Sequence, residues 1–246
     1  MHIVNESLKE VSNYKESHCL IAVCLYQKYL NEAYLDAVID FVNHNFKRCS
    51  VILCDSVYRH TRLIDSPGSI EDAYRFSREE GNFWLKNNLK ILERLTIESD
   101  LSLWEQWVFD SANYKKQEKL VNNLYDNDIN FQACINLEIE EYIERHFKSK
   151  NLSLENEDLY EWAKKCSTDY YIEECAGLLS IWRNLRMQYI LYPAVIPAPF
   201  AYIFKKFVNI RDPNALQWLH IDFKKIKLYE LKNKIEVDSI SHHLIT

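Results

Sequence analysis

A cysteine ends a short apolar run near the start of the chain. Residues 20–23 read Leu-Ile-Ala-Val, Cys24 follows, and the next residues are mostly polar. A helical pattern then covers about residues 30–46, before a second apolar run at 51–55. Strand, helix, strand in this order is typical of a βαβ unit with a parallel sheet, whose ligand crevice lies at the carboxyl ends of the strands. Cys24 is therefore a candidate nucleophile, although most free cysteines pack as small hydrophobic residues.

A tyrosine and a glutamate in a later helical pattern form a second candidate. Tyr170 and Glu174 are four residues apart, which places them on one face of a helix. A carboxylate held there could bind and deprotonate an amine. A shift of one residue in the helix register would put Tyr171 and Glu173 in their place. From spacing alone an ordinary surface pair explains these residues as well.

Five basic residues recur along a long helical pattern at about residues 70–95. Ser69 followed by Asp72 is typical of a helix start. Steps of three or four residues place the basic side chains on one face, which is either a solvated surface or a stripe that follows phosphates. The five residues are Arg75, Arg78, Lys86, Lys90 and Arg94.

Composition narrows the class of protein. The chain has 246 residues, 48% of them hydrophobic, and a net charge of −6, which suits one sizeable core and argues mildly against a coat of nucleic acid. Seven cysteines without a CxxC pair indicate neither a zinc site nor a disulfide framework. With no signal peptide and no apolar run long enough for a bilayer, we expect a cytoplasmic protein with no membrane partner. Only three glycines occur, and no phosphate-binding glycine loop is present, so the usual nucleotide sites are excluded.

The remaining pattern predicts an α/β protein with a Rossmann-like, mostly parallel sheet flanked by helices, in a single domain over 1–246. We interpret residues 58–67 as a loop and 100–107 as a weak strand or helix. Further helices are expected at 114–124, 130–147, 159–186 and up to about 208, and short strands at 189–191, 216–223 and 235–237.

Several separated features resemble one known family. The features are the run His18-x-Leu20-Ile21-Ala22-Val23-Cys24-x-x-Gln27-x-x-Leu30, Asp55, Tyr114 at the start of a lysine-rich helix, the pair Tyr170 and Glu174, and Tyr192-Pro193. Their order and spacing are similar to those of the cyclodipeptide synthases, over about residues 17–200. The resemblance implies a fold similar to the catalytic domain of class Ic aminoacyl-tRNA synthetases. It also implies an enzyme that makes a cyclic dipeptide, a 2,5-diketopiperazine, from two aminoacyl-tRNAs.

The resemblance implies no cofactor, no metal and no ATP, since the chain lacks His-x-Gly-His and Lys-Met-Ser-Lys-Ser. It also implies a monomer. Gln27 with Tyr192-Pro193 is similar to the family branch with a variable residue and Tyr-Pro, rather than the branch with Asn and Tyr-His. The family's nucleophile is a serine, and the matching residue here is Cys24. The cysteine is either the natural nucleophile or a replacement of that serine, and as a thiol it would form an aminoacyl thioester.

The resemblance also implies roles for individual residues. Cys24 would carry the aminoacyl group in a ping-pong reaction, Tyr170 and Glu174 would bind the amino group, and Tyr192 would orient the nucleophile or relay a proton. The first aminoacyl pocket would be lined by Leu20, Ala22 and Ile52, with further substrate contacts from Gln27, Tyr114 and Pro193. The basic stripe would contact tRNA. Because Ala22 replaces a glycine common in the family, we expect a preference for small or slender first residues.

Two other functions remain open at this stage. A cysteine-dependent hydrolase or acyltransferase for small thioesters would need a histidine base close to Cys24, for which His18 and His60 are candidates. A non-catalytic, tRNA-binding relative of the synthetase fold would bury Cys24 and form no covalent adduct.

Overall fold

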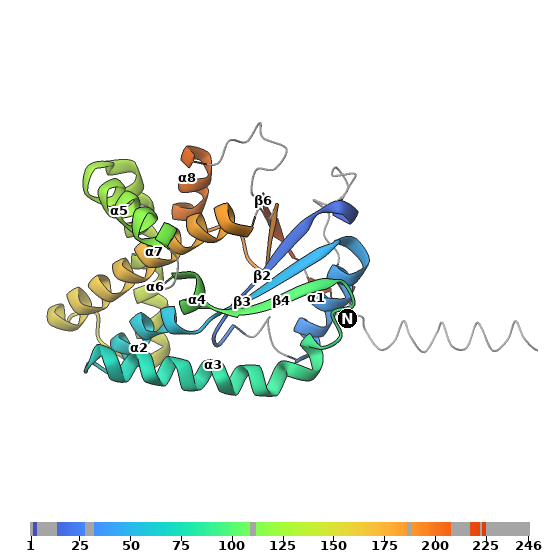
Figure 1. The fold of residues 1–246 in the computed structure, drawn as a ribbon. Helices are drawn as coiled ribbons and strands as arrows, with labels where there is room; N and C mark the ends of the chain where they lie inside the picture. Colours follow the sequence, from blue (N-terminus) through green and yellow to red (C-terminus); the bar gives the residue numbers. More distant parts are fainter. Residues whose placement is uncertain are drawn as a thin grey trace, which may run out of the picture.

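Five parallel strands form the central sheet (Figure 1). The computed structural model describes residues 2–3, 14–27, 32–108, 112–185, 188–207, 217–221 and 223–224. In the order β4-β3-β2-β5-β6, the strands are β4 (Glu98–Leu103), β3 (Arg48–Cys54), β2 (His18–Cys24), β5 (Tyr189–Tyr192) and β6 (Gln217–His220). The chain therefore winds outward from β2 first to one side and then to the other. Such a reversal of strand order opens a crevice at the carboxyl ends of the strands that flank it.

Eight α-helices are described, with two short 3₁₀ segments at Tyr14–Glu16 (η2) and Ser56–Tyr58 (η4). The helices are α1 (Glu32–Asn45), α2 (Arg59–Asp65), α3 (Ile70–Leu92), α4 (Trp104–Val108), α5 (Ala112–Asn127), α6 (Ile129–Lys150), α7 (Glu157–Leu185) and α8 (Ala198–Phe207). Apart from the main sheet, β1 (His2–Ile3) pairs antiparallel with β7 (Phe223–Lys224).

The central strands β2, β3 and β5 are buried on both faces, as is usual in parallel sheets, whereas the edge strand β4 is more exposed. Side chains alternate along each strand, so Ile21 and Val51 face one core together with α1 and α3. Leu20 and Ile52 face a second core, which α4 to α8 complete. Figure 1 shows α3 running along one side of the sheet, while α5 to α8 gather at one end of the molecule. This end is where the strands finish.

Two glycines allow helices to approach the sheet closely. A Cβ on Gly81 of α3 would lie 2.6 Å from the Cβ of Asp55, and one on Gly177 of α7 would lie 2.4 Å from the Trp104 ring. Asp55 follows β3 directly, is buried, and accepts a hydrogen bond from the Trp104 amide at 3.2 Å. Glycine at these two positions therefore sets how tightly α3 and α7 pack around the end of β3.

The expected βαβ unit is confirmed, with β2, α1 and β3 close to the predicted ranges, and the α/β fold with a parallel sheet is confirmed as well. The predicted loop at 58–67 is wrong, because most of it is helix α2. In this helix, two arginines interrupt the apolar pattern of a buried face formed by His60, Leu63 and Ile64, which packs against α7. Residues 100–107 divide into the end of β4 and the start of α4.

Three smaller points concern element ends. The long helix α3 stops at Leu92 rather than near residue 95, where hydrogen bonds of the tighter i to i−3 type replace helical ones. The predicted strand at 235–237 lies outside the described residues. Among the described helices, none combines the length and the apolar content that crossing a membrane would require.

Candidate active site

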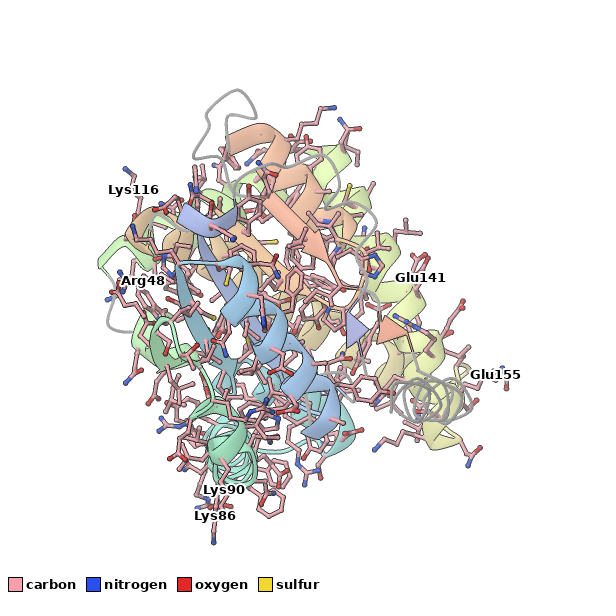
Figure 2. The ribbon with its side chains drawn as sticks, turned by 90° about the vertical axis from the view of Figure 1, so that its right-hand side faces the viewer. Arg48, Lys86, Lys90, Lys116, Glu141 and Glu155 are labelled. Atoms are coloured by element: carbon pink, nitrogen blue, oxygen red, sulfur yellow. The ribbon has the colours of Figure 1, made fainter. Side chains whose placement is uncertain are left out.

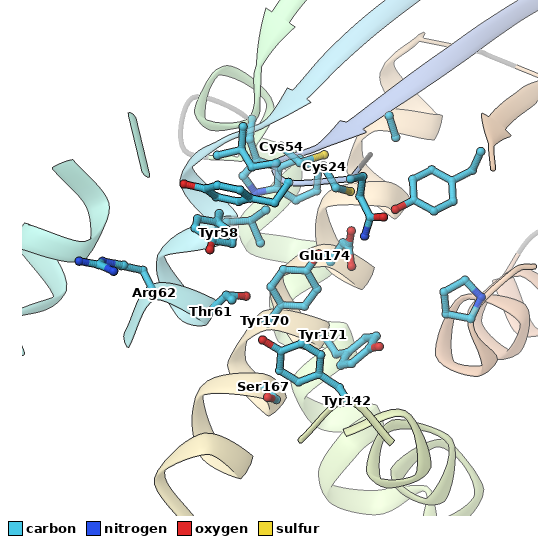
Figure 3. A pocket seen from close by; sticks show the side chains of 18 of the residues that line it. Cys24, Cys54, Tyr58, Thr61, Arg62, Tyr142, Ser167, Tyr170, Tyr171 and Glu174 are labelled. Atoms are coloured by element: carbon cyan, nitrogen blue, oxygen red, sulfur yellow. The ribbon is translucent and has the colours of Figure 1, made fainter. Parts of the chain in front are cut away.

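A cavity of about 660 Å³ opens at the carboxyl ends of the central strands (Figure 3). Cys24 ends β2, Cys54 ends β3 and Tyr192 ends β5, and all three line this cavity. Helix α7 forms the opposite wall with Tyr170 and Glu174. The cavity therefore lies where the reversal of strand order predicts a ligand site.

A tight turn holds Cys24 at the end of its strand. The Gln27 amide donates a hydrogen bond of 3.4 Å to the Cys24 carbonyl, and Tyr26 between them has a φ of 64°. A bulky residue rarely adopts this left-handed conformation, so the tertiary contacts of Tyr26 must stabilise it. Its ring packs on Tyr58 at 4.9 Å between centroids, and its hydroxyl donates to Glu80. The backbone after Cys24 is thus fixed by contacts from η4 and α3.

The surroundings of Cys24 favour its thiolate form. A hydrogen bond from Cys54 lowers the pKa of Cys24; burial opposes this, and a second hydrogen bond from the Tyr192 hydroxyl again lowers the pKa. The pKa of Cys54 is raised well above its ordinary value by its hydrogen bond with Cys24 and by burial. Burial likewise raises the pKa of Tyr192, helped by the nearby Cys24 charge. Of these three groups, Cys24 is the one that ionises first, with the other two as donors.

The surroundings of Glu174 favour its protonated form. Burial raises its pKa well above the ordinary value, and the neighbouring Cys24 charge adds to this, whereas a hydrogen bond with Tyr170 works in the other direction. Burial and the Glu174 charge also raise the pKa of Tyr170. Figure 3 shows Glu174 lying between Tyr170 and Cys24. A cationic ligand group placed beside Glu174 would restore its charge, because an opposite charge favours the ionised form.

The adjacent Glu173 has a different role. It is buried on another side of α7, where Arg59 and His60 of α2 pair with its carboxylate, His60 at 3.0 Å. The Trp104 indole also donates to it at 2.9 Å. Burial works to raise the pKa of Glu173, but the hydrogen bonds from His60 and Arg59 bring it down to about 2. Glu173 therefore ties α7 to α2 and α4, while Glu174 faces the cavity.

The expected pocket walls meet at the same place. Leu20, Ala22 and Ile52 line the cavity beside Cys24, and Gln27 lies at its exposed rim. Further apolar lining comes from α7 and β5, through Leu178, Ile181 and Ile190. Such a floor is suited to an aliphatic or small side chain.

Two expected substrate contacts do not line the cavity. Tyr114 on α5 is buried in the helical core, and its hydroxyl donates to Glu118 at 3.3 Å. Burial raises its pKa, with added effect from Glu173 and Glu118. Pro193 follows Tyr192 but is not among the lining residues, which include Pro197 instead.

The predicted basic stripe is not one continuous face, which corrects the sequence-based prediction. Arg78 turns inward, with its Nε 3.2 Å from Asp55 and a further ion pair to Glu105. Arg94 lies beyond the end of α3 and pairs with Asp36 and Asp40 of α1. Both arginines are held by carboxylates that the sequence pattern of one helix cannot show.

The other three basic residues lie in the exposed part of α3. Arg75 pairs with Asp72 one turn earlier, at 2.7 Å. Lys86 and Lys90 are exposed and extend away from the body of the molecule (Figure 2). A surface for nucleic acid on α3 therefore rests mainly on these two lysines.

The structure adds site residues that sequence reasoning missed. Cys54 lay in the second predicted apolar run without an assigned role, although it ends β3 as Cys24 ends β2. Tyr171 lines the cavity together with Tyr170. Arg145 and Lys150 of α6 also line it, and Lys150 lies 3.4 Å from Asp65. Only the fold brings α6 to the ends of the strands, so no spacing along the chain could have indicated these two cations.

The histidine base required by a cysteine-dependent hydrolase is not found at the candidate positions. His18 begins β2, at the opposite end of the strand from Cys24, and its Nε2 lies 2.9 Å from Ser50. His60 is buried against Glu173. The one histidine among the lining residues is His146, which pairs with Asp65 at 2.9 Å.

All seven cysteines are free. Across the described ranges, no group of three or more histidine, cysteine, aspartate or glutamate side chains could hold a metal ion.

Solved structures show what this chain is similar to. A cyclodipeptide synthase (CDPS) from Fluoribacter dumoffii is 30% identical, with a TM-score of 0.79, covering 85% of this chain and 92% of that one. A cyclodipeptide synthase from Candidatus Glomeribacter gigasporarum, bound to Phe-tRNAPhe, is 18% identical with a TM-score of 0.68, covering 90% and 94%. A Mycobacterium tuberculosis protein, described as showing that cyclodipeptide synthetases are related to type I tRNA synthetases, is 12% identical with a TM-score of 0.58, covering 83% and 84%. No protein-family model matches the chain, and no curated protein matches it by sequence.

Proposed function

The chain belongs to the cyclodipeptide synthase family, and we propose that it joins the aminoacyl groups of two aminoacyl-tRNAs into a cyclic dipeptide through an aminoacyl thioester on Cys24. One observation carries this proposal. A thiol with a lowered pKa faces a buried carboxyl group across a cavity at the carboxyl edge of the sheet, in a family whose relative from Candidatus Glomeribacter gigasporarum was solved with an aminoacyl-tRNA bound.

The first half of the reaction loads the enzyme. The Cys24 thiolate attacks the ester carbonyl of the first aminoacyl-tRNA, the carbon–oxygen bond breaks, and the 3′-terminal ribose hydroxyl of the tRNA leaves with a proton. Tyr192 donates a hydrogen bond to the sulfur before the attack, and its raised pKa keeps the hydroxyl protonated for that role. The apolar walls formed by Leu20, Ala22 and Ile52 receive the side chain.

Glu174 and Tyr170 hold the amino group of the loaded residue. A bound ammonium would release the proton from Glu174 and form a charge-assisted hydrogen bond with its carboxylate. The Tyr170 hydroxyl, already bonded to Glu174, keeps that carboxylate in place. When the amine must act as a nucleophile, the same carboxylate is positioned to accept its proton.

The second half forms both peptide bonds. The amine of the second aminoacyl-tRNA attacks the thioester carbonyl, the carbon–sulfur bond breaks to free Cys24, and the dipeptide remains esterified to the second tRNA. The free amine of the dipeptidyl group then attacks the remaining ester carbonyl, which closes the ring and releases the second tRNA. Both bonds draw on esters made beforehand, so the scheme requires no ATP. We also propose that the enzyme acts as a monomer in the cytoplasm.

The first test is mass spectrometry of a reaction with a mixed pool of aminoacyl-tRNAs. The unaltered chain should give cyclic dipeptides and a transient aminoacyl mass on Cys24, whereas Cys24→Ala should lower the yield by at least about a thousandfold, because no acyl-enzyme can form. The control is Cys134→Ala, since Cys134 is a half-buried thiol on α6 that is not among the lining residues.

Two results would contradict the proposal. Cyclic dipeptides from Cys24→Ala at the full rate would exclude the covalent route. If the unaltered chain binds tRNA but gives neither product nor adduct, it is a non-catalytic relative.

A further inference from the structure

We infer that Cys54 is a positioning residue whose thiol donates a hydrogen bond to the Cys24 sulfur and holds it as the attacking thiolate. This rests on the proposed function of Cys24 as nucleophile and adds the group that prepares it. Cys54 ends β3, thirty positions after Cys24 in sequence, and nothing in the local sequence around Cys24 indicates it.

The geometry of the sheet fixes this pair. Strands β2 and β3 are parallel neighbours, and Cys24 lies opposite Cys54 in their register. Residues at matching positions of parallel strands point to the same face of the sheet. Both side chains therefore enter the cavity together, and Figure 3 shows their sulfur atoms side by side. The proximity of the two thiols therefore follows from the register of the strands.

The described groups around Cys24 favour the same distribution of protons. Cys54 from β3 and Tyr192 from β5 both lower the pKa of Cys24 as hydrogen-bond donors. Glu174 and Tyr170 face it from α7, and burial raises the pKa of each, which favours their neutral forms. Cys54 itself is buried, with 3% of its surface exposed, so substrate can reach it less readily than the half-buried Cys24. A thiolate with two such donors is a stabilised nucleophile, and Cys24 is half-buried at the cavity rather than fully covered.

The same two strands contain a matched pair for comparison. Cys19 lies opposite Cys49 in the same register, five residues before the Cys24 pair. These two side chains belong to the core on the other face of the sheet, and both are fully buried. Burial, a hydrogen bond with Cys49 and the Cys49 charge raise the pKa of Cys19. This pair lies away from the cavity, so it is a control for two adjacent thiols that substrate cannot reach.

The test measures the reactivity of Cys24 without any tRNA. Full-length protein is alkylated with iodoacetamide between pH 5 and 10, and the rate at Cys24 is read from the mass of its peptide. Cys54→Ala should slow alkylation at pH 7 by about tenfold, because the thiolate loses one donor, and should move the pH profile upward. Cys54→Ser keeps a donor of similar size and should retain most of the rate. Cys49→Ala is the matched control on the same strand and should not change the profile.

A profile for Cys54→Ala that coincides with that of the unaltered chain would overturn the inference. So would an equal shift in Cys54→Ala and Cys49→Ala, since that would indicate a general loosening of the sheet. The outcome is separate from the proposed function, because alkylation requires no aminoacyl-tRNA. A protein that makes no cyclic dipeptide but shows the Cys54-dependent profile would refute the function and keep the thiol pair.

Discussion

Glu173 and Glu174 are neighbours in the chain, but their surroundings shift their pKa values in opposite directions. The pKa of Glu174 is raised well above its ordinary value, chiefly by burial, while that of Glu173 is about 2 because His60 and Arg59 outweigh its burial. Pairs of acids whose surroundings separate their pKa values in this way usually have different tasks. Here one carboxyl group lines the cavity, and the other joins three helices.

Replacing Glu174 by glutamine tests the cavity side of this pair. Glu174→Gln keeps the size and a hydrogen bond to Tyr170 but can neither balance an ammonium nor accept its proton. We expect the rate of cyclic dipeptide formation to fall by about a hundredfold to ten thousandfold, with the alkylation of Cys24 retained. The measurement is product yield by mass spectrometry beside the alkylation rate. A variant with full activity would remove Glu174 from the mechanism.

At the scale of elements, α3 presents one face to the core and another to solvent. Ala73, Ser77 and Trp84 are buried on the inner face, while Lys86 and Lys90 extend outward (Figure 2). The inward turn of Arg78 and the pairing of Arg94 with α1 leave these two lysines as the candidate contacts for tRNA phosphates.

The double variant Lys86→Ala with Lys90→Ala tests that surface. Each phosphate contact contributes a salt-dependent term, so we expect weaker tRNA binding and a salt slope smaller by about one to two units. Binding is measured at a series of salt concentrations. The control is Lys116→Ala with Lys119→Ala, two exposed residues of α5. If both double variants keep the original slope, the α3 lysines are an ordinary solvated face.

The packing of α7 on α4 depends on the absence of a side chain. A Cβ at Gly177 would lie 2.4 Å from the Trp104 ring, and that indole also donates to Glu173. Gly177→Ala should lower the free energy of unfolding by about 1–3 kcal/mol despite the better helix propensity of alanine, because the ring must move in a packed core. Denaturant unfolding measures this. The exposed Gly68, where a Cβ meets only a carbonyl at 3.8 Å, is the control for Gly→Ala; a stabilised Gly177→Ala would contradict the prediction.

On the scale of the whole molecule, we propose that residues 1–246 form one domain. The two cores lie on opposite faces of one sheet, and both include residues of β2 and β3. Glu173 joins α7 to α2 and α4 around the end of that sheet. Loss of this connection should therefore affect the stability of the entire fold.

The pH dependence of unfolding tests this connection. The folded pKa of Glu173 is about 2, below the ordinary value of 4.5. A lowered pKa means that its contribution is complete above about pH 4.5 and is lost as the pH falls toward 2. Between these limits the unaltered chain should lose about 3 kcal/mol more than Glu173→Gln. Denaturant unfolding at a series of pH values measures the difference, and parallel curves for the two proteins would contradict it.

Local patterns in the sequence determined much of the fold. The alternation of apolar runs and helical periods predicted β2, α1, β3, α3, α6 and α7, because burial of one face leaves a period in the sequence. The place of Cys24 at a strand end and the spacing of Tyr170 and Glu174 followed from the same periods. Helix α2 was not predicted, because arginines interrupt its short buried face.

Only the tertiary structure decided which residues meet. The strand register placed Cys54 against Cys24, and the rotation of α7 chose Glu174 rather than Glu173 for the cavity. The same packing turned Arg78 and Arg94 toward carboxylates on other elements. A sequence period fixes the face on which a side chain lies, but its partner and its charge depend on groups that are distant in the chain and close only after folding.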